Sequence, residues 1–513
     1  MRKISQDTIA IEDLDRQELI ALNYQLREQL ASVSAQLQAL TNRFFRSGTE
    51  KLDPNQLLLF GLGQGSPTTE PEVATEPKTL RKPVKGHGRK VFPSHLPRVD
   101  IRVEVPEADR HCSSCGCEMP VFDFEQTERG LVTPPMIVVN RYLREKRSCP
   151  HGHGVVVAPA PRTLIDKSKY ETGTYVRIVK SKYDDHLPLN RLSGMFKSWG
   201  MEIPKSTMWE MVLRVAELVA PVLEQMRREL LLLSILHADE TPVVACLEDG
   251  KGSKKAYIWV YMGQNKVLFD FTMSRERDGP MRFLGDWSGT LVVDGYSGYE
   301  PVIERNGIIR AGCFAHARRK LTEAWETGAK DAARLLLLVR QLFHVESVLA
   351  KRKERLSLAD AEFHALRLRV RQKRSSVLLQ KMEAEMNRLW VARLATPKST
   401  LGKTLTYLER QWPRLTQFLQ NGALEIHNND AERALRQVAI GRKNWMVFGS
   451  PRGGLAASRL YALVLSCKAS QINVEEYLTD ILDRLANTPA SDVASLTPWA
   501  WAAAKAAARP KTV

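Results

Sequence analysis

The sequence predicts an α/β protein in which a strand-rich core lies between helical segments. Residues 170–232 carry apolar side chains at helical spacing, whereas the stretch after Leu230 changes to short, alternating and β-branched runs. Residues 328–395 are rich in Leu, Arg, Lys and Glu, a composition typical of helices. The 513-residue chain is long enough for two or three domain-sized cores.

The charge of the chain favours a polyanionic partner. Lys and Arg outnumber Asp and Glu by 75 to 58, which gives a formal net charge of +17. Each phosphate that a cation neutralises releases condensed counterions, so this balance favours a nucleic acid. No apolar run is suited to a signal peptide or a membrane-spanning helix, so we expect no membrane contact and a cytoplasmic location.

The first 99 residues are predicted to form a helical segment and a linker. Residues 1–48 contain apolar residues that recur every seven positions, which predicts a coiled coil and self-association; they are Leu19, Leu26, Val33 and Leu40. A single amphipathic helix packed on its own domain is the alternative reading of this repeat. Residues 49–99 are rich in Pro and Gly and then in Lys and Arg, which is typical of a basic linker.

Four of the seven cysteines lie close together, which predicts a small zinc-binding module over 100–160. Tetrahedral zinc requires four donors, and two short-spaced pairs bring them together. The gap of 34 positions between the two pairs is longer than the usual ribbon spacing, so structural zinc is a hypothesis. The predicted ligands are Cys112, Cys115, Cys149 and His151, with His153 or Cys117 as alternatives.

Residues 161–232 are predicted to be helical and have the pattern of a helix-turn-helix region. Gly200 and Pro204 interrupt the helical pattern between two apolar stretches. The apolar stripe of the second stretch favours packing within the protein, because apolar helix pairs are far more common as core than as DNA readers. Contact with DNA is left open for the basic residues of this region, which are Lys197, Lys205 and Arg214.

Two strand-like stretches each carry an aspartate. The stretch SILHADETPVVACL alternates and so places His237 and Asp239 on one face, and the stretch AYIWVYMGQNKVLFDFT predicts a hairpin that turns near Gly263. The apolar run in GTLVVDGYSGY predicts a central strand that ends in Asp294. Two carboxylates brought side by side repel each other, and a divalent metal ion relieves this repulsion.

A third acid is expected from the segment IHNNDAERALRQ. Asn428 or Asn429 is predicted to start a helix, and Glu432 lies in its first turn, but Asn429 and Glu432 also fit a reciprocal helix cap. Asp430 and Glu425 compete for the same role. Carboxylates are the ligands that Mg²⁺ or Mn²⁺ prefers, and two such ions about 3.5–4 Å apart catalyse phosphodiester cleavage without a protein nucleophile.

Several motifs taken together resemble one known family. HADETP, VVDGYSGY, CFAHARRKL and HNNDAERALRQVAIGRKNWMVFGSPRGG are similar to the large transposase subunit of the bacterial insertion-sequence family numbered sixty-six, over nearly the whole chain. The resemblance implies an RNase-H-like catalytic domain over 233–450, with a helical insertion at about 328–395 and a C-terminal helical region over 451–513. It also implies an acidic triad, which maps onto Asp239, Asp294 and Glu432. The chain departs from the family where a second CxxC-like pair is usual, which leaves the fourth zinc ligand open.

Further residues are candidates for supporting roles. His237, Cys313 and His316 could assist the acids or be packed core groups. The basic stretches 351–355 and 367–374 are candidate DNA tracks or solvated helix faces. Cations near an aromatic suit phosphates and unstacked bases. The predicted DNA-binding residues are Arg318, Arg319, Lys320, Arg436, Arg442, Lys443, Trp445 and Arg452.

These observations predict a metal-dependent DNA transposase that cleaves the ends of an insertion sequence and transfers the strands to target DNA. The expected partners are double-stranded DNA, a second copy of the chain and small accessory proteins from the same element, and the protein is expected at the nucleoid when it acts. One alternative is a metal-dependent nuclease without strand transfer. Another is a non-catalytic, zinc-containing DNA-binding protein.

Overall fold

The computed structural model describes residues 137–148, 155–158, 163–165, 168–248 and 252–508. The predicted coiled-coil segment, the linker and all candidate zinc ligands lie outside these residues. Within the 100–160 region, β1 (Lys146–Ser148) pairs antiparallel with β2 (Val155–Val157). No helix in the described part of the chain is long and apolar enough to cross a membrane.

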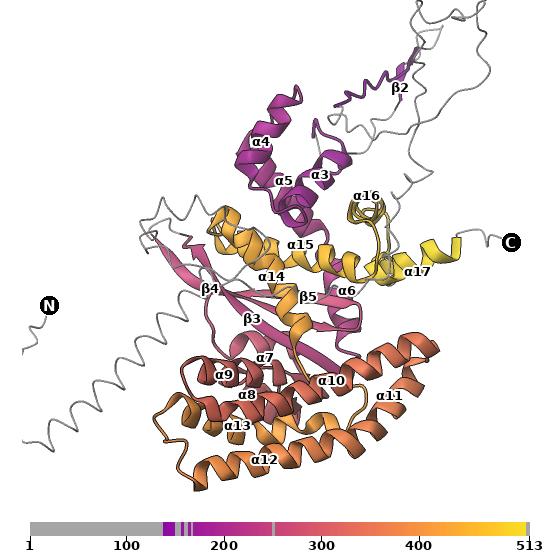
Figure 1. Ribbon diagram of the computed structural model, residues 1–513. Helices are drawn as coiled ribbons and strands as arrows, with labels where there is room; N and C mark the ends of the chain where they lie inside the picture. The colour runs from indigo at the N-terminus through magenta and orange to yellow at the C-terminus, as the bar shows by residue number, and fades with distance from the viewer. Residues whose placement is uncertain (1–136, 149–154, 159–162, 166–167, 249–251, 509–513) are drawn as a thin grey trace, which may run out of the picture. The chain divides into compact units, whose positions relative to one another are not determined.

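Four helices precede the central sheet (Figure 1), and their apolar faces are buried. They are α3 (Thr172–Tyr183), α4 (Leu189–Ser198), α5 (Lys205–Leu218) and α6 (Ala220–Leu230). Helix α5 packs against α3 and against α15 (Pro451–Ala469), with Val212 and Val215 fully buried. The apolar stripe of α5 therefore packs within the protein, while the side chains of Lys197, Lys205 and Arg214 are exposed.

The central sheet has five strands in the order β5-β4-β3-β6-β7. The first three strands along the chain, β3 (Ile235–Cys246), β4 (Ser253–Gly263) and β5 (Lys266–Thr272), form an antiparallel meander. Strands β6 (Thr290–Val292) and β7 (Ile309–Ala311) continue the sheet parallel to β3. The predicted hairpin is confirmed, since β4 and β5 are joined by Gln264 and Asn265, with Gln264 in the left-handed region at a φ of 53°.

Helices cover both faces of the sheet. Asp239 shares one face with Phe269, whose ring lies 6.1 Å from that of Tyr461 on α15. On the opposite face, Tyr261 stacks on Phe283 of α7 (Asp278–Leu284) at a centroid distance of 3.8 Å. Figure 1 shows α15 and α14 (Asn429–Trp445) running along the sheet. The face of β3 that carries Asp239 is therefore the face toward α14 and α15.

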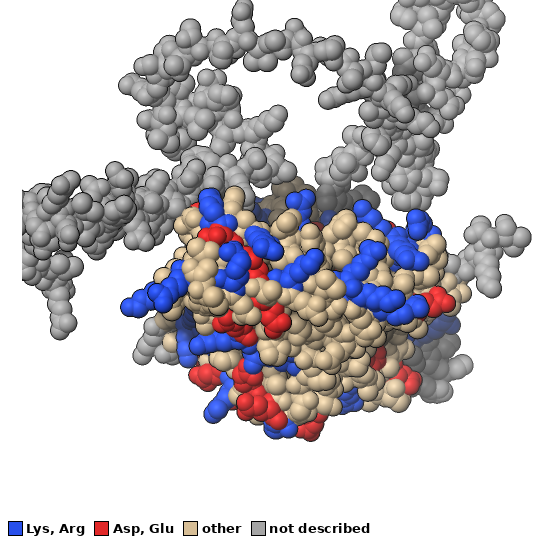
Figure 2. Space-filling view, turned by 60° about the horizontal axis from the view of Figure 1, so that its bottom comes forward, with Lys and Arg blue, Asp and Glu red and all other residues tan. Residues whose placement is uncertain are grey.

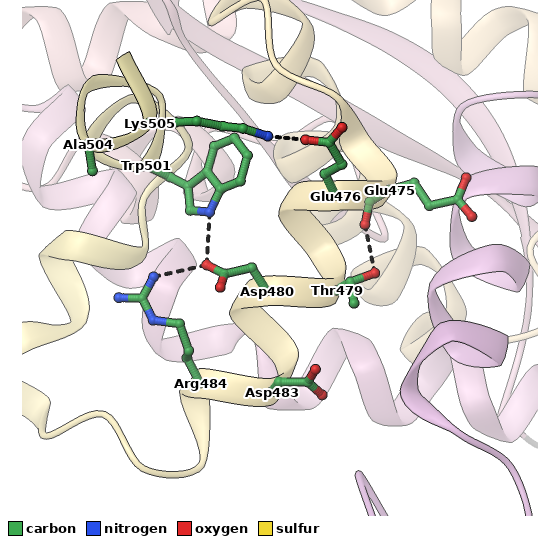
Figure 3. A pocket seen from close by; sticks show the side chains of 9 residues that line it. All are labelled: Glu475, Glu476, Thr479, Asp480, Asp483, Arg484, Trp501, Ala504 and Lys505. Atoms are coloured by element: carbon green, nitrogen blue, oxygen red, sulfur yellow. Dashed lines mark hydrogen bonds and ion pairs between the residues drawn. The ribbon is translucent and has the colours of Figure 1, made fainter. Parts of the chain in front are cut away.

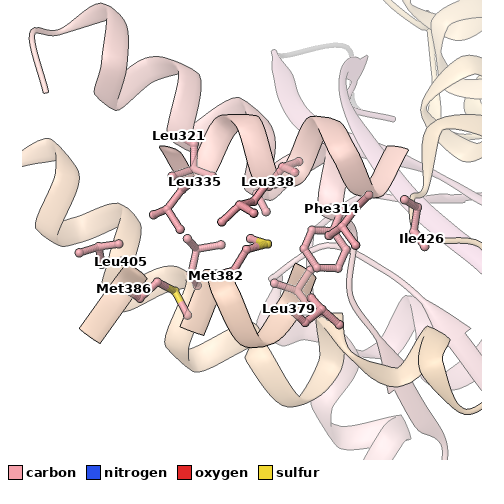
Figure 4. Packing of buried hydrophobic residues seen from close by; sticks show 14 of the residues in the cluster. Phe314, Leu321, Leu335, Leu338, Leu379, Met382, Met386, Leu405 and Ile426 are labelled. Carbon is pink, nitrogen blue, oxygen red and sulfur yellow. The ribbon is translucent and has the colours of Figure 1, made fainter. Parts of the chain in front are cut away.

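A helical layer packs beside the parallel end of the sheet. Buried apolar side chains from α9, α10, α12 and α13 meet there, including Phe314, Leu335, Met382 and Leu405 (Figure 4). Residues 328–395 contain α10–α12, as the composition predicted. The remaining elements up to α13 are η3 (Ser297–Tyr299), α8 (Glu300–Asn306), α9 (Phe314–Glu326), η4 (Lys330–Ala332), α10 (Ala333–Leu356), α11 (Asp360–Val370), η5 (Arg371–Ser375), α12 (Ser376–Val391) and α13 (Thr400–Leu415).

Two arginines of the basic stretch 367–374 are buried rather than exposed. Arg367 and Arg371 are 4% and 0% exposed, and both pair with Glu346 on α10. Arg371 also donates to the carbonyl oxygens of Phe418 and Leu424. The interpretation of this stretch as a DNA track is therefore wrong at these two positions, because their guanidinium groups tie α10 and α11 to the segment before α14.

The C-terminal region forms a helical layer around α15. Its elements after α13 are η6 (Gln417–Leu419), α14, α15, α16 (Val474–Leu485), η7 (Ala490–Leu496) and α17 (Pro498–Ala508). Ser450 caps α15 by accepting a hydrogen bond from the amide of Gly453, and Asn473 caps α16 in the same way. The hydroxyl of Ser466 on α15 bonds both backbone groups of Val267, which fixes α15 to the edge strand β5.

Candidate functional site

Three neighbouring parallel strands bring chemically active residues side by side in one row, within β3 and just past the ends of β6 and β7. His237, Val292 and Ala311 are register partners on β3, β6 and β7. Asp239, Asp294 and Cys313 each lie two positions after one of these partners. Neighbouring strands of a sheet lie about 4.8 Å apart. Asp239 and Asp294 therefore lie on adjacent parallel strand paths, as the sequence predicted.

Glu432 reaches this row from α14. Its Oε2 atom accepts a hydrogen bond from Arg319 at 3.1 Å, and its Oε1 atom lies 3.6 Å from Nδ1 of His316. Both partners belong to α9. The reciprocal cap is not formed, because the N-cap is Asn428 rather than Asn429 and makes no side-chain cap bond. The Glu432 carboxylate is thus turned away from its own helix backbone.

The two competing acids are engaged elsewhere. Glu425 accepts hydrogen bonds from Arg367 at 2.8 and 2.5 Å, within the buried network described above. Asp430 is exposed and pairs with Arg433 at 3.3 Å along the same helix. Of the three acids that the sequence left open, Glu432 is the one beside the strand ends.

Asn428 is a positioning residue that sequence reasoning treated only as a helix start. Its side chain is fully buried and donates to the carbonyl oxygen of Ala238 at 2.8 Å. Its Oδ1 atom lies 3.0 Å from Nδ1 of His237, and its backbone amide donates to Sγ of Cys313 at 3.2 Å. This one residue therefore fastens α14 to β3 and to the end of β7. The only sequence signal was a second Asn beside a helix start.

The surroundings of Asp239 disfavour its ionised form. Burial, followed by the neighbouring charges of Glu240, Asp294 and Glu432, raises the pKa of Asp239 to about 8. Its Oδ1 atom accepts a hydrogen bond from the amide of Glu240 at 2.8 Å, and no cationic side chain of the described residues pairs with it. A buried carboxylate without a partner is costly unless a cation binds it.

The loop after β6 is held by a buried arginine. Arg310 on β7 is 6% exposed and donates to the carbonyl oxygens of Asp294 and Tyr296 at 2.5 and 3.1 Å. It also forms an ion pair with Glu300, which Arg414 approaches at 2.8 Å. The Asp294 side chain in turn accepts a hydrogen bond from the amide of Tyr296 at 2.9 Å. Arg310 thereby determines where the Asp294 carboxylate lies.

Glu240 is a fourth acid near the row, but it belongs to the other face of the sheet. Its side chain is 3% exposed, forms an ion pair with Arg275 and accepts a hydrogen bond from Tyr299 at 3.1 Å. Because side chains alternate along a strand, Glu240 points away from the face that Asp239 shares with α14. It is a paired structural acid.

The predicted DNA-binding residues fall into two groups. Arg318, Arg319 and Lys320 are exposed on α9, where Arg319 contacts Glu432 and the other two lie over the rings of Phe343 and Tyr407. On α14, Arg436 and Lys443 are exposed. The others make contacts within the protein: Arg442 donates to the carbonyl oxygen of Pro242, the Trp445 ring packs 6.3 Å from Tyr183 and under Lys182 at 3.9 Å, and Arg452 pairs with Glu217 at 2.6 Å.

One face of the described residues carries charges of both signs. Figure 2 shows the face that the lower part of Figure 1 presents when turned forward, and there Lys and Arg are interspersed with Asp and Glu. A cavity of about 700 Å³ lies between α16 and α17 (Figure 3), where Asp480 accepts from Trp501 and Arg484, and Glu476 pairs with Lys505. Its acids are compensated internally, and it contains none of the three candidate acids.

A smaller cavity adjoins the candidate site. It has a volume of about 410 Å³ and is lined by Gly295, which follows Asp294, and by one face of α13. That face carries Lys403, Tyr407 and Arg410. The ammonium group of Lys320 lies 4.8 Å from the Tyr407 ring, so α9 and α13 present cations on the same side.

Comparisons with known proteins show the family of the chain. The family model described as "Transposase IS66 family" matches residues 167–456, and those described as "IS66 C-terminal element" and "Transposase C of IS166 homeodomain" match 462–499 and 33–101. Relatives include the uncharacterized proteins y4jD and y4hP of Sinorhizobium fredii (strain NBRC 101917 / NGR234). Each is 28% identical to this chain; the alignments cover 88% and 86% of it, and 90% and 82% of the relatives. The first match alone spans more than half of the 513 residues, and the chain therefore belongs to the IS66 family of transposases.

Proposed function

We propose that this chain is a transposase of the acidic-triad type, which cleaves DNA at the ends of an insertion sequence and joins the freed strand to target DNA. The observation that carries the proposal is the position of Asp239 and Asp294 on neighbouring parallel strand paths, with Glu432 on the same side of the sheet. Family membership supports the transposase role, and the site supports the chemistry.

The sheet supports an RNase-H-like core. Its order along the chain is an antiparallel meander of three strands followed by two strands parallel to the first, with the first strand at the centre. In this arrangement the first and fourth strands are neighbours and point the same way. Asp239 within the first strand and Asp294 just past the fourth can therefore present two carboxylates to one pair of ions.

The donor set fits hard divalent cations. Asp239, Asp294 and Glu432 offer carboxylate oxygens, which Mg²⁺ and Mn²⁺ prefer. The half-buried Asp239 carboxyl, with its pKa raised to about 8 and no cationic partner among the described residues, needs such a charge to ionise fully at neutral pH. Two ions about 3.5–4 Å apart each need carboxylate ligands. Glu432, which comes from a separate helix, can supply one that the two aspartates do not.

Bound Mg²⁺ would activate the attacking oxygen and stabilise the leaving 3′ oxygen. The residues of the chain orient the acids: Asn428 holds β3 against α14, Arg310 holds the Asp294 loop, and Arg319 holds Glu432. The α9 cations Arg318 and Lys320 lie where DNA phosphates would approach the acids.

The proposal includes partners and a second metal site. Pairing two element ends favours at least a dimer, small proteins of the same element could assist, and a chromosomal substrate implies action at the nucleoid in the cytoplasm.

We also propose structural zinc at Cys112, Cys115, Cys149 and His151, outside the described residues, with His153 or Cys117 as alternatives. Zinc content of the intact chain and of Cys115→Ser tests this part.

The proposed function is tested by divalent-metal-dependent cleavage of a labelled duplex that carries the element's end. Asp239→Asn, Asp294→Asn and Glu432→Gln should each lower cleavage about 1000-fold or more, because each removes several kcal/mol of transition-state stabilisation, while DNA binding is retained. The matched control is Asp430→Asn, which removes an exposed acid from the same helical turn and should keep full cleavage. Cleavage retained by any triad variant would remove that residue from the site.

A second assay separates the transposase from a plain nuclease. Radiolabelled, pre-cleaved ends are incubated with supercoiled target DNA and Mg²⁺, and joined products are resolved on a gel. Joined products that disappear in Asp294→Asn support strand transfer. Cleavage without joined products, in the presence of the element's accessory proteins, indicates a nuclease, and binding without either reaction indicates a non-catalytic DNA-binding protein.

A further inference from the structure

We propose that Cys313, which follows strand β7, forms with His316 and Glu432 a binding site for one thiophilic divalent ion, with Zn²⁺ as the natural occupant. One donor atom from each of the three residues lies within 4.8 Å of the other two. Cys313 and His316 belong to the start of α9, and Glu432 belongs to α14. The site is distinct from the proposed magnesium site, although it shares Glu432 with it.

Two unpaired polar atoms support the proposal. Nδ1 of His316 and Oε1 of Glu432 are both buried and have no hydrogen-bond partner among the described residues. They face each other at 3.6 Å, which is too long for a hydrogen bond. Tetrahedral zinc with bonds of about 2.0–2.3 Å separates its donors by roughly 3.3–3.8 Å, so an ion between these atoms would satisfy both.

The sulfur completes the donor set. Cys313 is 2% exposed, and its Sγ atom accepts a hydrogen bond from the amide of Asn428 at 3.2 Å. Cys313 is also the N-cap of α9, where free backbone amides favour an anionic ligand. Coordination requires loss of the thiol proton, which passes to solvent. Sulfur, imidazole and carboxylate donors together suit Zn²⁺ or Co²⁺ rather than Mg²⁺.

The backbone around the three ligands is held in place. The Phe314 side chain is fully buried, and its amide donates to the carbonyl oxygen of Ile426 at 2.9 Å, which ties the start of α9 to the segment before α14. Three protein ligands leave a fourth position for water. Glu432 would bind this ion through Oε1, while its Oε2 atom accepts the hydrogen bond from Arg319.

A functional consequence follows, and it rests on the proposed function. The Glu432 oxygen that coordinates Zn²⁺ at this site is withdrawn from the proposed magnesium site. Zinc binding should therefore inhibit Mg²⁺-dependent cleavage, and Cys313→Ser should make whatever cleavage remains less sensitive to zinc. The binding of the ion does not depend on that consequence and is tested separately.

The test titrates Co²⁺ into the full-length chain and follows sulfur-to-cobalt charge-transfer absorption in the near ultraviolet, with metal content measured after dialysis. Cys313→Ser should bind one equivalent fewer than the intact chain and lose part of the absorption. The matched control is Cys467→Ser, which removes a fully buried cysteine of α15 and should change neither quantity. Any cobalt at the N-terminal cysteines contributes equally to all three proteins.

A second variant covers the case in which Cys313→Ser does not fold. His316→Gln keeps the thiol and should weaken cobalt affinity at this site at least about tenfold. Equal stoichiometry and affinity in the intact chain and in the folded variants would overturn the proposal. Because the readout is absorption and metal content rather than cleavage, an inactive transposase with normal cobalt binding would contradict only the proposed function.

Discussion

Replacing Asp239 with Asn should stabilise the metal-free protein. The carboxyl has a pKa near 3.8 when exposed, and burial raises it to about 8 in the fold. A raised acid pKa means that the folded state resists ionisation, so its destabilising effect is absent below pH 3.8 and grows as the pH rises toward 8. Asn carries no charge and keeps the oxygen that accepts the hydrogen bond from Glu240.

The size of the effect follows from the interval between the two pKa values. Each pH unit between the two pKa values changes the free energy of unfolding by about 1.4 kcal/mol. The Asp239 carboxyl therefore lowers the free energy of unfolding by up to about 4 kcal/mol at pH 7. Relaxation of the site and entry of water reduce this maximum. We expect Asp239→Asn to raise the free energy of unfolding by about 2–4 kcal/mol at pH 7. In the presence of Mg²⁺ the intact protein should be more stable than Asp239→Asn, because the ion binds the intact site and not the variant.

Urea unfolding followed by tryptophan fluorescence, with divalent ions chelated, measures the free energy of unfolding at pH 4.5, 6 and 7.5. The stability advantage of Asp239→Asn should be small at pH 4.5 and grow at each step. Asp286→Asn, which alters a fully exposed acid, should show no such trend. A constant difference between the two proteins across this range would refute the assignment of a raised pKa to Asp239.

Three other substitutions test the groups that hold the site. Asn428→Ala should cost about 2–4 kcal/mol of unfolding free energy, since it leaves buried partners unpaired, whereas Asn429→Ala should cost less than about 1 kcal/mol in the same urea assay. Arg310→Lys cannot reproduce the three contacts of the guanidinium group, and should lower the cleavage rate more than the affinity for DNA in single-turnover kinetics. Arg371→Met should lower the free energy of unfolding by about 2–4 kcal/mol, because the buried carbonyl oxygens of Phe418 and Leu424 lose their donor and Glu346 keeps only Arg367; an unchanged midpoint would contradict this.

Local pattern was sufficient for the strands of the core. The change of period after Leu230 coincides with the end of α6 and the start of β3, and the hairpin turns within the predicted residues. Alternation placed Asp239 on the same face as His237, and the apolar run before Asp294 is β6. These features follow from residues close in sequence, which is why they could be predicted.

The third acid shows where local pattern failed. In sequence, Glu432 had the spacing of a helix cap with Asn429, and Glu425 and Asp430 were equally available. The choice depends on α9 and α11, which supply Arg319 to Glu432 and Arg367 to Glu425. Neither contact can be predicted from neighbouring residues in the sequence, since the partners are 113 and 58 positions apart.

The sequence by itself determined the strand and helix periods, the two strands that carry or precede Asp239 and Asp294, and the basic character of the chain, because these depend on near neighbours and on composition. It did not determine that β3 continues past Asp239 to Cys246. The tertiary structure decided that Glu425 and Asp430 pair with arginines while Glu432 contacts α9, that Asn428 fastens α14 to β3, and that Arg367 and Arg371 are buried rather than exposed. It also brought Cys313 and His316 to Glu432. Such contacts arise only when segments far apart in the chain pack together, and packing selects among residues that look alike in sequence.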